Sequence, residues 1–200
     1  MKKIFLLLAL ISTFSLLNAQ EEDPNNIETL FKKPSKIRGY VGSLTNTTTL
    51  DGELAYMSGA TAAGIFNDHF ILGFYKLELE NNVFSNNDNY VGSTMDFDHK
   101  GIWLGYIFMP KRMIHFNANV QAGKGNLEIY DDIADSWIED DFVFTLTPSL
   151  EAEFNVAKFL RVGIGANYRF VFDVDRFDNY DNNDFSDLGA FISFKFGWFN

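Results

Sequence analysis

Few residues in this sequence have the types and spacing that catalysis requires. The chain has no cysteine, which excludes disulfide bonds, thiolate metal sites and cysteine nucleophiles. Of its three histidines, His99 follows shortly after Asp96 and Asp98, and by triad logic one aspartate could orient His99 toward Ser93 as a nucleophile. Such spacing is common in polar segments and does not single out a catalytic site. We therefore expect no enzymatic activity and no cofactor.

A second group of ionisable residues carries both signs and lies on the hydrophilic side of alternating segments. Its members are Glu78, Glu151, Glu153, Arg161, Arg169 and Lys195. If that side faces the inside of a barrel, burying any one of these charges alone is costly, so they must pair. A turn near residues 156–157 would bring Glu153 across from Arg161. We predict a structural ionic network that plugs the lumen; the alternative is a network in which Glu151 or Glu153 exchanges partners and opens a narrow channel.

Acidic residues gather in two polar segments, and their carboxylates suit hard cations such as Ca²⁺. The first group comprises Asp131, Asp132, Asp135, Glu139, Asp140 and Asp141. The second comprises Asp173, Asp175, Asp178, Asp181, Asp184 and Asp187. The spacing and central glycine of an EF-hand loop are absent, so we assign no metal ligands. Solvated loops are the expected interpretation, with divalent cations or surface partners at these loops as the alternative.

The elements that position these side chains are predicted to be β-strands. Apolar and polar residues alternate with period two, which puts one kind on each face of a strand, whereas a helix would scatter them. Eight such runs cover residues 37–47, 53–66, 69–82, 94–109, 113–130, 137–154, 159–174 and 185–199. In the third run the pattern puts Ile71, Tyr75 and Leu77 on the apolar face. Lys76 and Glu78 then fall on the polar face.

The connections between the runs alternate between short and long. Short connections lie at residues 67–68, 110–112 and 156–157, whereas long polar connections cover residues 46–52, 83–93, 131–136 and 175–184. Because consecutive hairpins point in opposite directions, this alternation places every long loop at one end of the sheet. Transmembrane barrels have that asymmetry.

The bulky apolar side chains decide which face points inward. The interior of an eight-stranded barrel is just wide enough for side chains to fill it, so the many aromatic residues of the apolar rows would not fit there. We place those rows, including Phe170 and Phe194, against lipid and the small hydrophilic rows in the lumen. Closure joins the last strand to the first, because unsatisfied backbone groups in hydrocarbon are costly. The predicted fold is all-β, a closed antiparallel up-and-down transmembrane β-barrel of about eight strands.

The last run ends in the aromatic-rich sequence Phe194-Lys195-Phe196-Gly197-Trp198-Phe199. Together with the eight alternating runs, it resembles the small outer-membrane β-barrel family of Gram-negative bacteria, the OmpA-like and OmpX-like group, over roughly residues 37–200. Members of that family end in a strand with a terminal aromatic residue that the barrel-assembly machinery reads. Here Asn200 follows the last aromatic, which departs from the pattern. The resemblance implies residence in the cell outer membrane, with outer-membrane lipid and the assembly machinery as partners.

The N-terminal residues predict export. A basic start, Met1-Lys2-Lys3, precedes an apolar stretch, and the sequence Leu17-Asn18-Ala19 would place a signal-peptidase cut before Gln20. We expect a signal peptide over residues 1–19, a periplasmic tail over residues 20–36 and one barrel domain over residues 37–200. The 27 acidic residues outnumber the 16 basic ones, which opposes binding to nucleic acid.

The predicted function is that of a non-catalytic outer-membrane barrel with a structural or surface-interaction role and a lumen plugged by polar and ionic side chains. A small porin-like channel is the first alternative. A lipid-modifying outer-membrane enzyme is the second.

Overall fold

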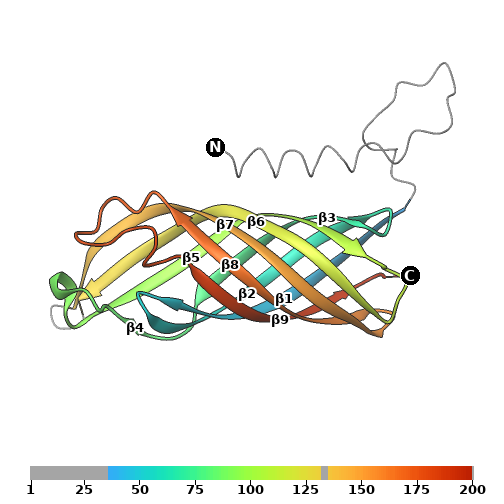
Figure 1. Ribbon diagram of the computed structural model, residues 1–200, viewed down its shortest axis with the longest axis horizontal. Helices are drawn as coiled ribbons and strands as arrows, with labels where there is room; N and C mark the ends of the chain where they lie inside the picture. Colours follow the sequence, from blue (N-terminus) through green and yellow to red (C-terminus); the bar gives the residue numbers. More distant parts are fainter. Residues whose placement is uncertain (1–35, 132–134, 200) are drawn as a thin grey trace, which may run out of the picture. The chain divides into compact units, whose positions relative to one another are not determined.

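The computed structural model describes residues 36–131 and 135–199, and this part of the chain is built almost entirely of β-strands (Figure 1). The strands are β1 (Ile37–Leu50), β2 (Glu53–Phe66), β3 (Phe70–Leu79), β4 (Val83–Phe84), β5 (Ser93–Phe108), β6 (Ile114–Asp131), β7 (Ser136–Ala157), β8 (Leu160–Phe172) and β9 (Asp187–Gly197). One short 3₁₀ helix, η2 (Asp88–Tyr90), lies between β4 and β5. Among the described residues no helix is long and apolar enough to cross a membrane.

Eight of these strands form a closed antiparallel ring. Each pairs with its neighbour in the chain, β3 pairs with β5, and β1 pairs with β9 to close the barrel. The two-residue strand β4 pairs with the loop end of β5 and adds no member to the ring. Closure leaves no open sheet edge whose backbone groups would face lipid. The predicted eight-stranded barrel, including the pairing of the last strand with the first, is confirmed.

The strands are tilted, as the register of their pairing shows. A row of Cα partners that starts at Val162 on β8 and passes through β9, β1, β2, β3, β5, β6 and β7 returns to β8 at Phe172. The return point lies ten residues nearer the long loops. Such a stagger accompanies strand tilt in a closed barrel. Each register row therefore comes closer to the loop end as it passes from β9 round the barrel to β8.

The predicted connection lengths are right at residues 67–69, 80–92, 109–113 and 173–186, but the first connection differs. The connection predicted as long at 131–136 spans only residues 132–135, and the turn predicted at 156–157 lies at 158–159 because β7 continues to Ala157. Asn67 and Asp68, between β2 and β3, both have positive φ, as a two-residue hairpin turn requires. The connection from β1 to β2 is equally tight, because Asp51 and Gly52 also have positive φ. We predicted a long loop over residues 46–52, but β-branched threonines extend β1 to Leu50.

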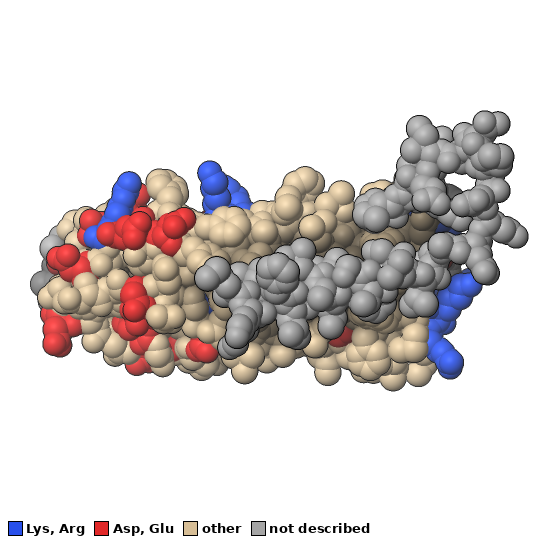
Figure 2. Space-filling model, turned by 45° about the horizontal axis from the view of Figure 1, so that its top comes forward, with Lys and Arg blue, Asp and Glu red and all other residues tan. Residues whose placement is uncertain are grey.

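The outer face of the barrel is apolar, as predicted. Phe170 and Phe194, whose placement inside would have contradicted the membrane assignment, are 40% and 39% exposed on the outside. Other large apolar side chains exposed on this face are Phe74, Ile102, Phe116, Phe142, Leu150, Ile164 and Phe196. In Figure 2 most of the visible acidic side chains lie toward the long-loop end, whereas basic ones lie at that end, on the wall beside it and at the opposite end. The apolar wall between them forms the surface of a transmembrane barrel.

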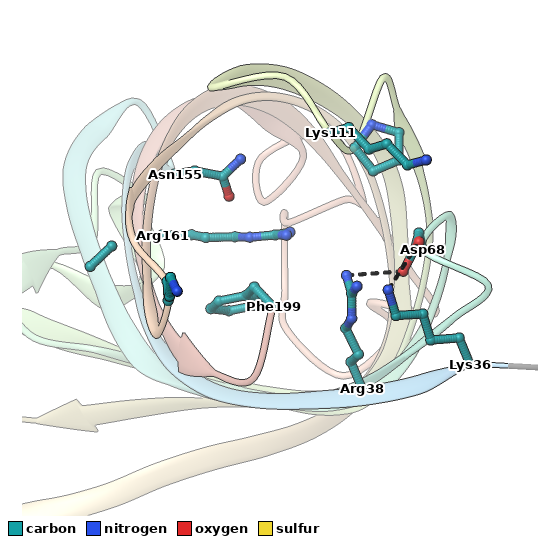
Figure 3. Close-up of a pocket in the computed structure, with 10 residues that line it drawn as sticks. Lys36, Arg38, Asp68, Lys111, Asn155, Arg161 and Phe199 are labelled. Carbon is teal, nitrogen blue, oxygen red and sulfur yellow. Dashed lines mark ion pairs between the residues drawn. The ribbon is translucent and has the colours of Figure 1, made fainter.

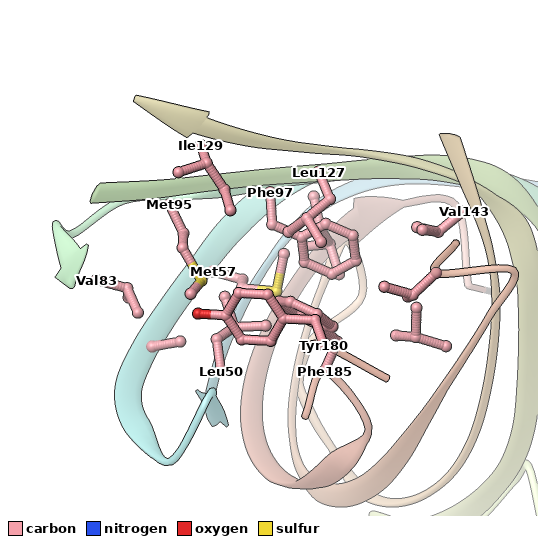
Figure 4. Close-up of a cluster of buried hydrophobic side chains, with 14 of the residues drawn as sticks. Leu50, Met57, Val83, Met95, Phe97, Leu127, Ile129, Val143, Tyr180 and Phe185 are labelled. Atoms are coloured by element: carbon pink, nitrogen blue, oxygen red, sulfur yellow. The ribbon is translucent and has the colours of Figure 1, made fainter. Parts of the chain in front are cut away.

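The lumen is less uniformly hydrophilic than we predicted. Its loop-side part is packed with large apolar side chains (Figure 4). Fully buried members of this cluster include Leu50, Met57, Phe97, Leu127, Ile129 and Phe185. The inward face of β3 is also the opposite of the one predicted, because Tyr75 and Leu77 are buried inside whereas Lys76 and Glu78 are exposed outside. Glu78 therefore does not belong to the lumen.

The predicted signal peptide (1–19) and nearly all of the predicted periplasmic tail (20–36) lie outside the described residues. They stay predictions.

The orientation of the wall can be tested with single cysteines, since the native chain has none. In intact cells, a membrane-impermeant maleimide should label Asp181→Cys, in the exposed β8–β9 connection, and leave Ile164→Cys, on the apolar face, unlabelled. The turn-end control Lys158→Cys should react only after the outer membrane is permeabilised. Strong labelling of Ile164→Cys in the folded, membrane-embedded protein would contradict the orientation.

Candidate functional site in the barrel lumen

Two carboxylates and two cations meet inside the barrel near its turn end. The ammonium group of Lys195 (Nζ) lies 2.7 Å from Glu151 Oε2 and 2.5 Å from Glu153 Oε2. Arg161 reaches Glu153 Oε1 with one guanidinium nitrogen at 2.9 Å. All four side chains are at least 96% buried. Opposite charges thus balance in the cluster, which we call the ionic network.

Neutral side chains complete the hydrogen bonding of the two carboxylates. The amide of Asn117 donates to Glu151 and to Glu153, at 3.1 Å in each case. The hydroxyl of Ser193 donates to Glu151 Oε1, and His115 Nε2 lies 2.8 Å from Glu153 Oε1. Each carboxylate therefore has at least three polar partners, which is what buried charge requires.

Aromatic rings hold the two cations in place. Lys195 Nζ lies 5.4 Å from the ring centre of Trp103 and 5.7 Å from that of Tyr40, and these two rings meet edge to face. The guanidinium of Arg161 stacks 4.0 Å above the ring of Phe199. Cation–π contacts gain strength in desolvated sites. The network and its rings thus lie together inside the lumen at this level.

A glycine on β8 makes room for the network. Strand β8 lies between β7, which carries the two glutamates, and β9, which carries Ser193. Gly163 on β8 is the Cα partner of Glu153 on β7 and of Ser193 on β9. A Cβ atom at Gly163 would come within 1.9 Å of Glu151 Oε1. The absence of a side chain at Gly163 therefore lets the Glu151 carboxylate lie against the barrel wall.

A cationic cavity of about 570 Å³ lies at the turn end, beside the network (Figure 3). Its charged lining residues are Lys36, Arg38, Asp68, Lys111, Lys158 and Arg161. Arg38 pairs with Asp68 at 2.9 Å, and Lys36 lies 3.7 Å from the same carboxylate. Arg161 and Phe199 border both the cavity and the network, so they separate the network from the water at this mouth.

Arg169, the sixth predicted member of the ionic network, lies in the lumen but apart from the other cations. Its guanidinium donates to the carbonyl oxygens of Phe185, at 3.0 Å, and Thr49, at 2.9 Å. It also lies 5.3 Å from the ring centre of Phe97. Arg169 thus fastens the β8–β9 connection to the inner wall, and it does not pair with the glutamates.

The β8–β9 connection, residues 173–186, packs into the loop end of the barrel. Phe177, Tyr180 and Phe185 are buried there, and the Tyr180 ring stacks on that of Tyr90 at 5.9 Å. Burial raises the pKa of the Tyr180 hydroxyl well above its usual value. The hydroxyl therefore stays protonated and donates to Asp51 Oδ2 at 2.8 Å. We call these residues, with the apolar cluster beneath them, the loop-end cap.

The catalytic arrangement considered from the sequence does not form. His99 and Ser93 both face inward, but six residues of extended strand separate them, which is roughly 20 Å. Asp96 and Asp98 alternate with His99 along β5, so their side chains leave from the opposite face. His99 instead lies 3.3 Å from the Tyr75 hydroxyl and stacks on Phe97.

The acidic loops use several of their carboxylates for local hydrogen bonds. Asp141 accepts from the backbone N–H groups of Asp175 and Arg176, at 2.9 and 3.1 Å. Asp181 accepts from the N–H of Asn183 at 2.6 Å. Within residues 36–131 and 135–199 no group of three or more His, Asp or Glu side chains is arranged to hold a metal ion. The carboxylates fix the shape of the loops.

Sequence reasoning missed the aromatic partners of the network. Trp103 is 2% exposed, inside the lumen, although large aromatic residues were expected outside. A signal was present, because Gly101 and Gly105 lie two residues to either side on the same face of β5. Glycines on an inward face leave space for one large side chain between them.

Comparisons with known proteins identify the fold. No protein-family model matches the sequence, and no curated protein matches it significantly. Among solved structures, Neisserial surface protein A (NspA) matches with a TM-score of 0.56 and 11% identity, over 82% of this chain and 100% of that one. The N-terminal β-barrel domain of Pseudomonas aeruginosa OprF matches with a TM-score of 0.53 and 10% identity, over 80% and 97%. The attachment invasion locus protein Ail of Yersinia pestis matches with 0.51 and 11%, over 81% and 97%. At such identities the likeness shows a shared fold, that of small outer-membrane β-barrels.

Removing one carboxylate should destabilise the barrel strongly. Glu153→Ala leaves Arg161 and Lys195 buried with too little negative charge, so the free energy of unfolding should fall by roughly 3–5 kcal/mol. Urea titration of the refolded protein, followed by heat-modifiable gel mobility, measures this change. The control Glu80→Ala removes the same group from an exposed position just after β3 and should change stability little. Equal losses in the two variants would contradict the buried pairing.

Adding one methyl group beside the network should also be costly. Gly163→Ala forces the Glu151 carboxylate away from Ser193 and Lys195, and overpacking of this kind costs about 1–3 kcal/mol. Gly39→Ala is the matched control, because its Cβ would meet only a carbonyl oxygen at 3.6 Å. The same urea titration should show a lower midpoint for the first variant alone.

Proposed function

We propose that this outer-membrane β-barrel is a closed, non-catalytic barrel with a structural or surface-interaction role, whose lumen does not conduct. The observation that carries the proposal is the ionic network of Glu151, Glu153, Arg161 and Lys195, which is buried and balanced in charge. An eight-stranded barrel leaves little room beside side chains of this size.

The partner geometry favours a fixed plug over a gate. Lys195 contacts both carboxylates at once, and Glu153 is held by Lys195, Arg161 and His115 together. For a channel to open, one carboxylate would have to lose several charge-assisted hydrogen bonds in a low-dielectric site, which is costly. Within the described residues, neither Glu151 nor Glu153 contacts a further cation that could replace the lost partner.

The loop-end cap supports the same conclusion at the opposite mouth. Arg169 ties the β8–β9 connection to the wall, and the phenol of Tyr180 ties it to Asp51 in the β1–β2 turn. The side-chain amide of Asn87 also donates to the carbonyl oxygen of Asp178 at 2.9 Å. Ions would have to pass two separate barriers of different chemistry.

The surface role rests on what the loop end exposes. Trp137 and Ile138, at 60% and 45% exposed, accompany the acidic residues of the same segment. Exposed aromatic side chains are typical anchors for protein partners, and an acidic surround favours a basic partner. NspA is by name a surface protein and Ail an attachment protein, which agrees with this role. The assembly machinery and outer-membrane lipid are the other partners we propose.

Planar-bilayer recordings on the refolded full-length chain test the closed lumen. We expect no steady conductance from the native sequence, because both barriers are in place. Glu153→Ala should also stay closed at the loop end, where the cap is unchanged. Reproducible channel openings by the native protein would overturn the proposal in favour of a small porin-like channel.

A further inference from the structure

One row of cations interrupts the apolar outer wall of the barrel. Lys76, Lys100 and Lys124 project outward from β3, β5 and β6, and their Cα atoms are direct partners across the two strand pairs. Neighbouring strands lie about 4.8 Å apart, so the three Cα atoms fall within about 10 Å. Like charges directly opposite one another destabilise a sheet, and cations on a lipid-facing wall are costly. The row therefore needs an anion over it.

Little within the protein supplies that anion. Lys76 pairs with Glu78 two residues further along β3. Lys100 and Lys124 form no ion pair with any residue in the described part of the chain. Asp98 lies on the same face of β5 as Lys100, next toward the loops, but beyond ion-pair distance. Two adjacent lysines thus have no ion-pair partner, and the Asp98 carboxylate acts on Lys100 only at longer range.

The lysine row lies at the loop-side border of the apolar wall. Toward the turns, the next outward residues on β3 and β5 are Phe74 and Ile102, at 69% and 45% exposed. Toward the loops, the next outward residues are Glu78 and Asp98. Because register rows come closer to the loop end from β3 to β6, Lys124 lies nearest the loop end of the three and Lys76 lies farthest from it. The long stem of a lysine lets its ammonium group rise to the level of lipid headgroups.

A groove of about 860 Å³ runs along the outer wall from this row toward the turns. Lys76 and Lys100 line its loop-side end. Small residues form its floor, Ser43 on β1 with Ala60 and Ala62 on β2, and its larger lining side chains are Val41, Phe74, Ile102 and Phe196. The groove is an apolar hollow with cations at one end, which matches an acyl chain joined to an anionic headgroup.

We infer that the groove and the lysine row bind one molecule of the phosphorylated glycolipid of the outer leaflet. One acyl chain occupies the groove, and the headgroup phosphates lie on Lys100 and Lys124. Lysine is a common phosphate ligand, and a basic residue near a membrane surface strengthens binding to anionic lipid. The site is assigned to the outer leaflet because it lies at the loop-side border, so the inference rests on the proposed function. Two adjacent lysines without an ion-pair partner favour a headgroup with two phosphates over a phospholipid with one.

Native mass spectrometry of the full-length refolded barrel in detergent micelles, titrated with purified diphosphoryl lipid A, tests the inference. We expect a single high-affinity adduct with the native sequence. The double variant Lys100→Gln/Lys124→Gln should bind it at least about tenfold more weakly. The control Lys111→Gln/Lys158→Gln removes the same charge from the turn end and should leave binding unchanged.

A second pair of variants tests the groove without changing charge. Ala62→Phe fills its floor and should weaken the adduct, whereas Ala166→Phe, on the outer face of β8, should not. Heat-modifiable gel mobility verifies that every variant is folded.

Equal binding by the native sequence and the lysine double variant would overturn the inference, and so would the absence of any adduct. Equal affinity for phosphatidylglycerol would overturn the assignment to the phosphorylated glycolipid. These outcomes are separate from the fate of the proposed function, because a barrel that binds no lipid can still be closed, and a conducting barrel can still bind lipid at its outer wall.

Discussion

Hydrogen bonding of the backbone is the constraint on which the rest of this structure depends. In hydrocarbon no water can satisfy an N–H or C=O group, so the sheet must close on itself. Closure of eight strands fixes a narrow interior, and a narrow interior leaves no solvent for an ionised side chain. Glu151 and Glu153 are therefore stable only because cations reach them across the lumen. The ionic network is a consequence of the closed ring, and its balance of charge follows from the same constraint.

The sequence predicts the ring well because strand alternation is a local signal repeated eight times. The pairing of Glu153 with Arg161 is likewise near in sequence, since both lie close to one turn. Sequence alternation failed on β3, where Tyr75 and Leu77 are as apolar as the outward Phe74, so the pattern could not tell the two faces apart. Lys76 and Glu78 were consequently assigned to the wrong side. Their true position is informative, because charges on a lipid-facing wall need a separate explanation.

The loop end could not be predicted from local pattern at all. Arg169 contacts the backbone of Phe185 and Thr49, and Tyr180 contacts Asp51. These contacts join segments far apart in the sequence, and each depends on how an irregular connection folds back into the barrel. The many Asn and Asp residues of these loops predict that the loops are exposed to water. In the structure, aromatic residues of the same loops are buried and give the loop end a hydrophobic core of its own. The molecule therefore has buried ionic side chains near its turn end and a buried apolar cluster near its loop end.

The length of β7 determines how far the loop end of the barrel projects from the membrane. Its 22 residues are about twice the 9–11 that a tilted strand needs to cross the hydrocarbon layer. At 3.3 Å per residue and a tilt near 40°, the eight residues of β7 that lie on the loop side of Phe144, the partner of Lys124, raise the strand end roughly 20 Å above the lysine row. The paired extensions of β5, β6 and β7 thus form a stalk at the loop end. Such a stalk can present its tip beyond a layer of surface sugars that would hide a barrel cut flush with the membrane.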